Sequence, residues 1–306
     1  MVYINMQREQ ITYCRYAPSL GALEGTPQDV WGTPEYHWRK NRHDPCVFFG
    51  MYDLRDYLML WQHRGKAYVL WAGSDITNLS YGFLLNDGKL RTLSVISQGL
   101  FEKRLKKMLM KAEHYVENTA EAERLQFCLQ SFGLAKKDIN VIPSYMGNTD
   151  DLKPSYKHDS RLKAYLCSPQ GREAEYGFSV IERIADKVPE VDFYLYGSNE
   201  WKTNKKNIIV RGRVTKEVMN DEIKDMQVAI RLNFFDGFSE IVAKGILLGQ
   251  HVITRIPYTG LLNITKNDDI VAHLKHIMFF GQEGLNKNTR QNLINTFNKY
   301  PWYKNI

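Results

Sequence analysis

The residues best suited to chemistry stand together in a short polar stretch, at Asp236, Gly237 and Ser239. A carboxylate such as Asp236 can accept two or more hydrogen bonds from hydroxyl groups of a ligand. Ser239 is a good cap for a helix, whose first N–H groups, at 237–240, would then point outward. Such a helix start favours anions, phosphate above all. The stretch therefore predicts an anion site, although Asp-Gly is also common as a simple turn before a helix.

The elements around this stretch must position it. An apolar strand is expected at 228–232, and apolar residues recur at helical spacing after Ser239 up to Gly249. A second strand is expected at 251–254, and Gly245 would let the helix approach the sheet closely. The pattern predicts a strand, a ligand loop, a helix and a second strand in succession.

This unit resembles a motif of retaining glycosyltransferases of group 1 (family 4-like) with the GT-B fold. The motif has an acidic residue, Gly, an aromatic residue or Leu, Gly or Ser, and a second acidic residue eight positions after the first. A Gly and a Val-Ile strand follow. The chain is similar without a gap at Asp236, Gly237, Phe238, Ser239 and 249–253.

The departure from the motif is Lys244, which stands where such enzymes have a glutamate that contacts the nucleotide's ribose. One interpretation pairs Lys244 with Glu240 on a solvated helix face, a contact worth only about 0.3–0.5 kcal/mol. The other brings its ammonium to the ribose or diphosphate of a bound nucleotide. Both stay open at this point.

The resemblance implies an α/β fold of two Rossmann-like domains facing across a cleft. It implies transfer of a sugar from a nucleotide-diphosphate sugar to a hydroxyl acceptor, a glycan, a lipid-linked glycan or another, with retention. The second domain would hold the donor and the first the acceptor. No cofactor and no metal is expected, since cations and backbone N–H groups can stabilise the leaving diphosphate.

The resemblance also assigns a role in donor binding to the loop after the strand expected at 162–167. In such enzymes an Arg and a Lys near this loop neutralise the diphosphate. Arg172, beside Gly171, fits the arginine position, and a simple surface residue is the less favoured alternative. The lysine position falls near Glu175 or Tyr176. Because that lysine is missing, we hypothesise that Lys244 takes over part of its work.

Three further loops are candidates because they follow strands, and ligands of open α/β sheets bind at the carboxyl ends of strands. Gly212 and Val214 stand where the resembling enzymes hold the base by backbone contacts, and Gly197, at the end of another expected strand, is expected to face the same crevice as a donor contact. Asp75 follows the strand expected at 66–72 and is a candidate for the acceptor hydroxyl or donor sugar. For Asp75, capping of a helix is the favoured alternative.

The 306 residues predict two domains, at 1–150 and 151–306, each with strands and helices in alternation. Residues 1–44 are expected to be irregular, with an acceptor-binding loop as the alternative, and no opening strand is expected before Cys46. A strand is expected at 93–96 and a helix from Ser97 to about 111. A last helix at 287–300 is expected to cross back to the first domain.

Composition narrows the kinds of protein that the chain can be. The four cysteines are far apart and predict free thiols. No apolar run is long enough to span a membrane, so a cytoplasmic location is the default expectation. The net charge of +7 permits anionic partners without selecting one, and no specific nucleic acid is expected. The lysine-rich stretch 101–111 is either a solvated face or a peripheral contact with anionic membrane. Motifs of dinucleotide oxidoreductases, P-loop proteins and α/β-hydrolases are missing from the sequence.

Two other functions remain compatible with the same fold. The altered position 244 and the missing lysine fit a catalytically silent module that binds nucleotide or glycan. A nucleotide-sugar epimerase would need an acid and a base near the anomeric carbon, and the sequence offers no convincing pair.

Overall fold

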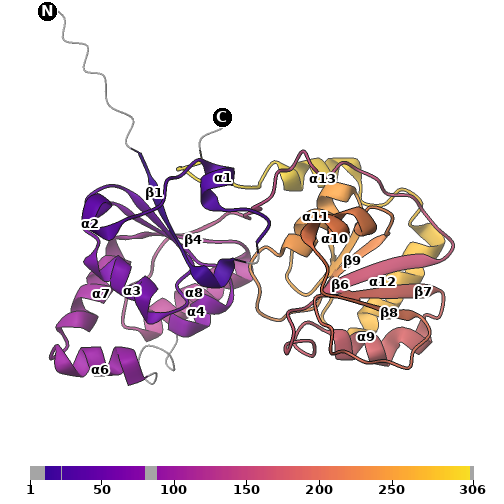
Figure 1. Ribbon diagram of the computed structural model, residues 1–306, viewed down its shortest axis with the longest axis horizontal. Helices are drawn as coiled ribbons and strands as arrows, with labels where there is room; N and C mark the ends of the chain where they lie inside the picture. The colour runs from indigo at the N-terminus through magenta and orange to yellow at the C-terminus, as the bar shows by residue number, and fades with distance from the viewer. Residues whose placement is uncertain (1–10, 22, 80–87, 304–306) are drawn as a thin grey trace, which may run out of the picture. The chain divides into compact units, whose positions relative to one another are not determined.

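The computed structural model describes residues 11–21, 23–79 and 88–303 (Figure 1). The chain forms two compact units. The first takes in the chain up to Met146 together with the segment from Asn298 onward, and the second is Gly147–Phe297. The sequence placed the division near residue 150.

The first unit is built on a parallel sheet of five strands in the order β1-β2-β3-β4-β5. The strands are β1 (Tyr13–Tyr16), β2 (Cys46–Phe49), β3 (Ala67–Leu70), β4 (Glu113–Val116) and β5 (Ile139–Val141). The helices are α1 (Pro27–Trp31), α2 (Trp38–Asn41), α3 (Leu54–Gln62), α4 (Ser74–Leu79), α6 (Gly88–Ile96), α7 (Leu100–Lys111) and α8 (Thr119–Ser131), with a short 3-10 helix at Pro18–Leu20.

Alternation along the strands builds a core on each face of this sheet. In β2, Cys46 and Phe48 join one buried cluster, whereas Val47 and Phe49 join the other. Because a strand sends successive side chains to opposite faces, a strand that is apolar throughout must be covered on both sides. Polar caps start the covering helices: Asp53 and Asp56 form a capping box at α3, and Asn118 accepts from the Glu121 N–H at α8.

Two predictions for this unit are wrong. An opening strand does exist before Cys46: β1 pairs in parallel with β2 from Tyr13 opposite Cys46 to Tyr16 opposite Phe49. As a four-residue edge strand between turns, it carries little periodic signal. The stretch expected as a strand at 93–96 is the end of α6, where Val95 and Ile96 are exposed, and the next helix is capped at Gly99 rather than Ser97.

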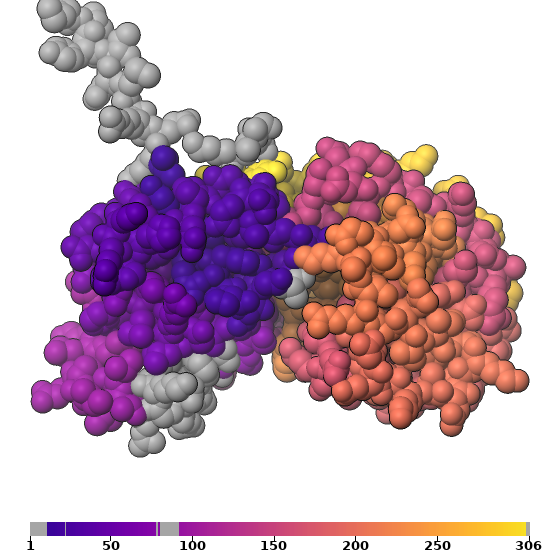
Figure 2. Space-filling view, in the orientation of Figure 1, coloured from indigo at the N-terminus to yellow at the C-terminus, as the bar shows by residue number. Residues whose placement is uncertain are grey.

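The second unit has a parallel sheet of six strands in the order β11-β10-β9-β6-β7-β8. The strands are β6 (Leu162–Cys167), β7 (Val191–Tyr196), β8 (Ile208–Gly212), β9 (Val228–Arg231), β10 (His251–Thr254) and β11 (Leu262–Asn263). The helices are α9 (Phe178–Ile184), α10 (Lys216–Ile223), α11 (Glu240–Leu248), α12 (Asn267–Phe280) and α13 (Lys287–Ile294), with a 3-10 turn at Ala185–Lys187. Residues around α10 and α11, orange in Figure 2, make up much of the visible surface of this unit.

The predicted unit from β9 to β10 is confirmed, including the close approach at Gly245. A Cβ atom at position 245 would lie 2.8 Å from the Cβ of Ala229 on β9 and 2.8 Å from a methyl of Val252 on β10. Any side chain there would push α11 off the sheet. The position of the ligand loop therefore depends on this glycine.

The chain returns to the first unit after α13, but not as a helix. The helix expected to run to residue 300 ends at Ile294, and Asn298 has a left-handed φ of 55°. The Asn298 side chain accepts from the Trp31 indole N–H at 3.3 Å and donates to the Tyr145 carbonyl at 2.8 Å. Tyr300 and Trp302 then stack with ring centroids 4.6 Å apart in the first unit's core.

None of the helices in the described part of the chain is long and apolar enough to cross a lipid bilayer.

Candidate functional site

The strand order of the second sheet points to a candidate binding site at the carboxyl ends of two central strands. The chain runs from β6 to β7 and β8 on one side and then to β9 and β10 on the other side of β6. Strand order thus reverses between β6 and β9, and open α/β sheets bind ligands outside the carboxyl ends of the strands at such a point. The residues there are Cys167, at the end of β6, and Arg231, at the end of β9.

Arg231 and Asp236 form a largely buried ion pair across the ligand loop. Their side chains are 12% and 19% exposed, and Arg231 Nε donates to Asp236 Oδ2. The guanidinium also lies 4.4 Å from the ring centroid of Tyr176. Burial alone would lower the pKa of Arg231, but the Asp236 carboxylate and Tyr176 outweigh it and raise that pKa. The loop therefore holds a fixed cation at the strand ends.

Lys244 supplies a second cation in the same place. It is only 3% exposed, so the interpretation that puts it on a solvated helix face is wrong: this face of α11 is covered. Burial raises the pKa of the Cys167 thiol, and the charges of Arg231 and Lys244 oppose that rise. The two cations thus both act on the end of β6.

The start of α11 lies beside these cations. The Ser239 hydroxyl accepts from the Ile241 N–H at 3.3 Å, and the Gly237 carbonyl accepts from the Tyr258 hydroxyl at 2.7 Å. Phe238 is 5% exposed and packs edge-on against Tyr258, so its side chain anchors the loop in the core. Glu240, the first residue of α11, is half-buried.

One polar atom in the ligand loop is buried without a partner. The Asn233 side chain is 2% exposed, and its Oδ1 accepts no hydrogen bond from any described residue. A buried acceptor without a partner costs about 1–3 kcal/mol unless water or a ligand satisfies it. Asn233 is therefore a candidate contact that the motif did not single out.

Arg172 and Gly171 lie in the loop after β6, on its solvent side. Arg172 is 47% exposed, pairs with Glu175 through Nε and Oε2 at 2.8 Å, and lies 5.2 Å from the ring centroid of Tyr176. Gly171 is exposed, and its N–H donates to Glu173 at 2.9 Å. Tyr176, near the position of the missing lysine, is thus contacted by two guanidinium groups, those of Arg172 and Arg231.

Arg231 is the functional candidate that sequence reasoning missed. It stands at the end of an otherwise apolar strand, Val228–Arg231, five residues before Asp236. A charged residue that closes a buried parallel strand is itself a signal, because such strands are apolar throughout unless the charge has a task at the edge.

The remaining predicted donor contacts lie at the ends of β7 and β8. Gly197 has a φ of 93°, and a Cβ atom there would lie 2.2 Å from the Ser168 carbonyl oxygen, so this strand end approaches the end of β6. The Gly197 N–H donates to the Gly212 carbonyl at 2.7 Å, and Val214 is half-buried before α10. These three positions therefore lie along the same edge as Cys167.

Asp75 lies in the first unit, where backbone N–H groups hold its carboxylate. It is fully buried, and its carboxylate accepts from the Met51 N–H at 2.9 Å and the Ala72 N–H at 3.0 Å. Burial raises its pKa to about 7, against the backbone hydrogen bonds that favour the charged form. It is the second residue of α4 and ties the loops after β2 and β3 together.

No group of three or more His, Cys, Asp or Glu side chains that could hold a metal occurs among residues 11–21, 23–79 and 88–303. All four cysteines are free.

Comparisons with known proteins agree on the fold. No family model and no curated protein sequence matches the chain. Among solved structures, a lipopolysaccharide outer core galactosyltransferase, WaaB, is similar with a TM-score of 0.56 and 13% identity over 96% of each chain.

Two longer structures are similar as well. TarM of S. aureus matches with a TM-score of 0.54 and 14% identity, and the pneumococcal O-GlcNAc transferase GtfA, solved with UDP and GlcNAc, with 0.52 and 13%. They cover 84% and 82% of this chain, which spans about half of each of them, 52% and 54%. With two parallel Rossmann-like α/β units, the chain has the fold of the GT-B glycosyltransferases.

Proposed function

We propose that this protein is a glycosyltransferase that moves a sugar from a nucleotide-diphosphate sugar to a hydroxyl group of a glycan or similar acceptor, with retention. The observation that carries the proposal is the pair of buried cations, Arg231 and Lys244, at the switch point of the second sheet. Burying a cation is costly unless it is paired, and cations fixed in a covered site stabilise negative charge that develops on a leaving group. The GT-B fold and the similarity to structures of sugar transferases support it.

In the proposed reaction, the bond between the anomeric carbon and the diphosphate oxygen breaks and the acceptor oxygen bonds to that carbon. The hydroxyl proton leaves with the departing diphosphate. Arg231, Lys244 and the N–H groups at the start of α11 stabilise the charge on that leaving group. Asp236, held by Arg231, accepts hydrogen bonds from the sugar hydroxyls.

Arg172 adds a weaker contribution in this proposal, because it is exposed and already paired with Glu175. Gly197, Gly212 and Val214 contact the donor through their backbones. Asp75 is left out of the reaction, since backbone N–H groups hold its carboxylate. No metal is required when side-chain cations carry the charge of the diphosphate.

The test is turnover and thermal stabilisation with a panel of nucleotide-diphosphate sugars, on the wild type, Asp236→Ala and a matched control, Asp192→Ala. Asp192 is also a carboxylate paired with an arginine, Arg161, but it belongs to the amino-terminal end of β7. We expect one donor to stabilise the protein and to release its nucleotide, and Asp236→Ala alone to lose turnover. Equal turnover in both variants would refute the role of Asp236.

The same experiment separates the second candidate function, a silent module that binds nucleotide. Lys244 in place of the motif's glutamate favours it, because one conserved contact of the resembling enzymes is replaced by a group of opposite charge. Stabilisation by a nucleotide without turnover, over the full panel and with added sugar acceptors, would support the module and reject the transferase.

A further inference from the structure

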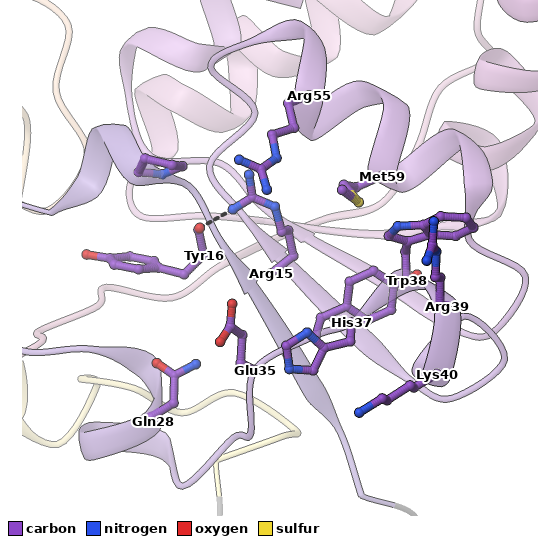
Figure 3. A pocket seen from close by; sticks show the side chains of 12 residues that line it. Arg15, Tyr16, Gln28, Glu35, His37, Trp38, Arg39, Lys40, Arg55 and Met59 are labelled. Atoms are coloured by element: carbon purple, nitrogen blue, oxygen red, sulfur yellow. Dashed lines mark hydrogen bonds between the residues drawn. The ribbon is translucent and has the colours of Figure 1, made fainter.

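The first unit has a pocket that the proposed reaction does not use. Its volume is about 560 Å³, within the range of about 300–1,000 Å³ typical of ligand sites. It opens beside β1, and its walls come from β1, α1, α2 and α3 (Figure 3). All residues that line it belong to the first unit.

Positive charge dominates the lining. Four cationic side chains, those of Arg15, Arg39, Lys40 and Arg55, face one carboxylate, that of Glu35. Figure 3 shows the guanidinium groups of Arg15 and Arg55 on the same side of the pocket. Like charges gathered in a concave site raise the local concentration of anions.

The charges differ in how far the protein already neutralises them. Arg15 is 12% exposed and pairs with Asp56 at 2.7 Å. Within the described residues, Arg39, Lys40 and Arg55 have no carboxylate within ion-pair distance; Arg39 lies over the Trp38 ring, 5.2 Å from its centroid. Three cations are thus available to an anion, and one of them is fixed at the wall by an aromatic ring.

The rest of the lining is suited to a sugar. Tyr16 and Trp38 offer aromatic surface, while Glu35, Gln28 and His37 offer polar groups below Arg15 in Figure 3. A carboxylate and an amide together can accept from and donate to several hydroxyl groups. A bare inorganic anion would need only the cations.

We propose that this pocket binds an anionic saccharide, one that carries phosphate or carboxylate. The acidic group contacts Arg55, while Arg39 adds positive charge at the wall beside Trp38 (Figure 3), and the hydroxyl groups contact Glu35 and Gln28. That the ligand is also the acceptor of the sugar transfer rests on the proposed function; the binding itself does not.

The test measures affinity by titration calorimetry without any nucleotide-sugar, with glucose 6-phosphate, glucuronic acid, glucose and inorganic phosphate as probes. Arg39→Ala/Arg55→Ala is compared with Lys103→Ala/Lys107→Ala, which removes two exposed cations from α7 in the same unit. We expect at least one of the two acidic sugars to bind more tightly than both glucose and phosphate. We expect the first variant to weaken it about 10-fold or more and the second less than about 2-fold.

Glucose 6-phosphate and glucuronic acid distinguish a phosphate group from a carboxylate. Phosphate alone binding as tightly as the acidic sugars would overturn the saccharide part, and equal losses in the two variants, or no binding of any probe, would overturn the site. Donor turnover in the control variant Lys103→Ala/Lys107→Ala is expected to match the wild type. A protein that binds acidic sugars but turns over no donor of the panel, even with added sugar acceptors, would refute the proposed function and leave this site standing.

Discussion

The two units differ in what holds the polar side chains that follow their parallel strands. In the first unit, polar side chains that follow strands are occupied by the backbone: Asp75 after β3 accepts from two N–H groups, and Glu121 beyond β4 accepts from the Glu117 N–H. In the second unit, Arg231 closes β9 and is paired with Asp236, and the buried Lys244 of α11 acts together with it on the end of β6. The strand-end carboxylates of the first unit are thus held by backbone N–H groups, whereas the carboxylate that follows β9, Asp236, is held by an arginine.

The comparison teaches that a strand-end carboxylate is not by itself evidence of catalysis. Backbone N–H groups at the ends of parallel strands need acceptors, and an Asp or Glu nearby satisfies them. Burying a cation is costly unless it is paired, so Arg231, which is paired with Asp236, and the covered Lys244 are the more informative residues there.

Among the variants that test this comparison of the two units, Arg231→Ala is expected to have the largest effect on donor turnover. The change removes a cation from the leaving diphosphate and leaves Asp236 without its partner, so donor turnover should fall on the order of 100–1,000-fold. Arg161→Ala is the matched control, because Arg161 lies next to the opposite end of β6 and pairs with Asp192. Comparable turnover of Arg231→Ala and Arg161→Ala would contradict the special role given to Arg231.

Asp75→Asn is expected to affect stability and not nucleotide binding. Its amide cannot accept from both the Met51 and Ala72 N–H groups, so the free energy of unfolding in urea should fall by about 2 kcal/mol. The exposed Asp138→Asn should change it by less than about 0.5 kcal/mol. A loss of donor affinity in Asp75→Asn without a loss of stability would return Asp75 to the reaction.

The same variant has a pH signature. The pKa of Asp75, about 7 in the folded protein, is raised above its ordinary value of 3.8, so the native state binds the proton more tightly than the unfolded state. The contribution of this group to stability is therefore present at low pH and is lost as pH rises from about 4 to about 7. The stability difference between wild type and Asp75→Asn should accordingly be larger at pH 5 than at pH 8.

Lys244→Met tests whether the second cation binds phosphate. The unbranched apolar side chain fits the covered face of α11, so we expect a folded protein whose affinity for the donor is lower by about 10-fold. Calorimetric titration with the donor would measure this affinity, and detection of the released nucleotide would measure the turnover. Unchanged affinity would mean that Lys244 has a packing role only.

The smallest effect is expected from Arg172→Ala. Arg172 is 47% exposed and paired with Glu175, and exposed pairs contribute about 0–1 kcal/mol. Donor turnover should fall less than about 5-fold, and less than in Arg231→Ala. A loss as large as that of Arg231→Ala would show that Arg172, as the motif implies, is the main cation.

The sequence predicted the region from β9 to β10 well because its signals agree: an apolar strand, a serine cap, helical periodicity and a terminal glycine at 249. It failed where a local pattern was ambiguous. Val95 and Ile96 are strand formers by type, but they end a helix, and both are exposed. A short edge strand such as β1 has too few residues to show its period.

The site was predictable in its position and only partly in its residues. The loop that holds Asp236 follows from the spacing, whereas the burial of Lys244 and the pairing of Arg231 with Asp236 depend on packing between elements that lie apart in the chain. The pocket beside β1 could not be predicted, because it joins residues from four short elements without a common period.

The return of the chain to the first unit also has a consequence for synthesis. Because Trp31 and Tyr115 are covered by Tyr300 and Trp302, the amino-terminal unit cannot complete its core until the ribosome has passed residue 302. Domains generally fold in the order in which they are made. Here the second unit, Gly147–Phe297, is fully translated while the first still lacks these two aromatic side chains, so the unit made first is the last to be finished.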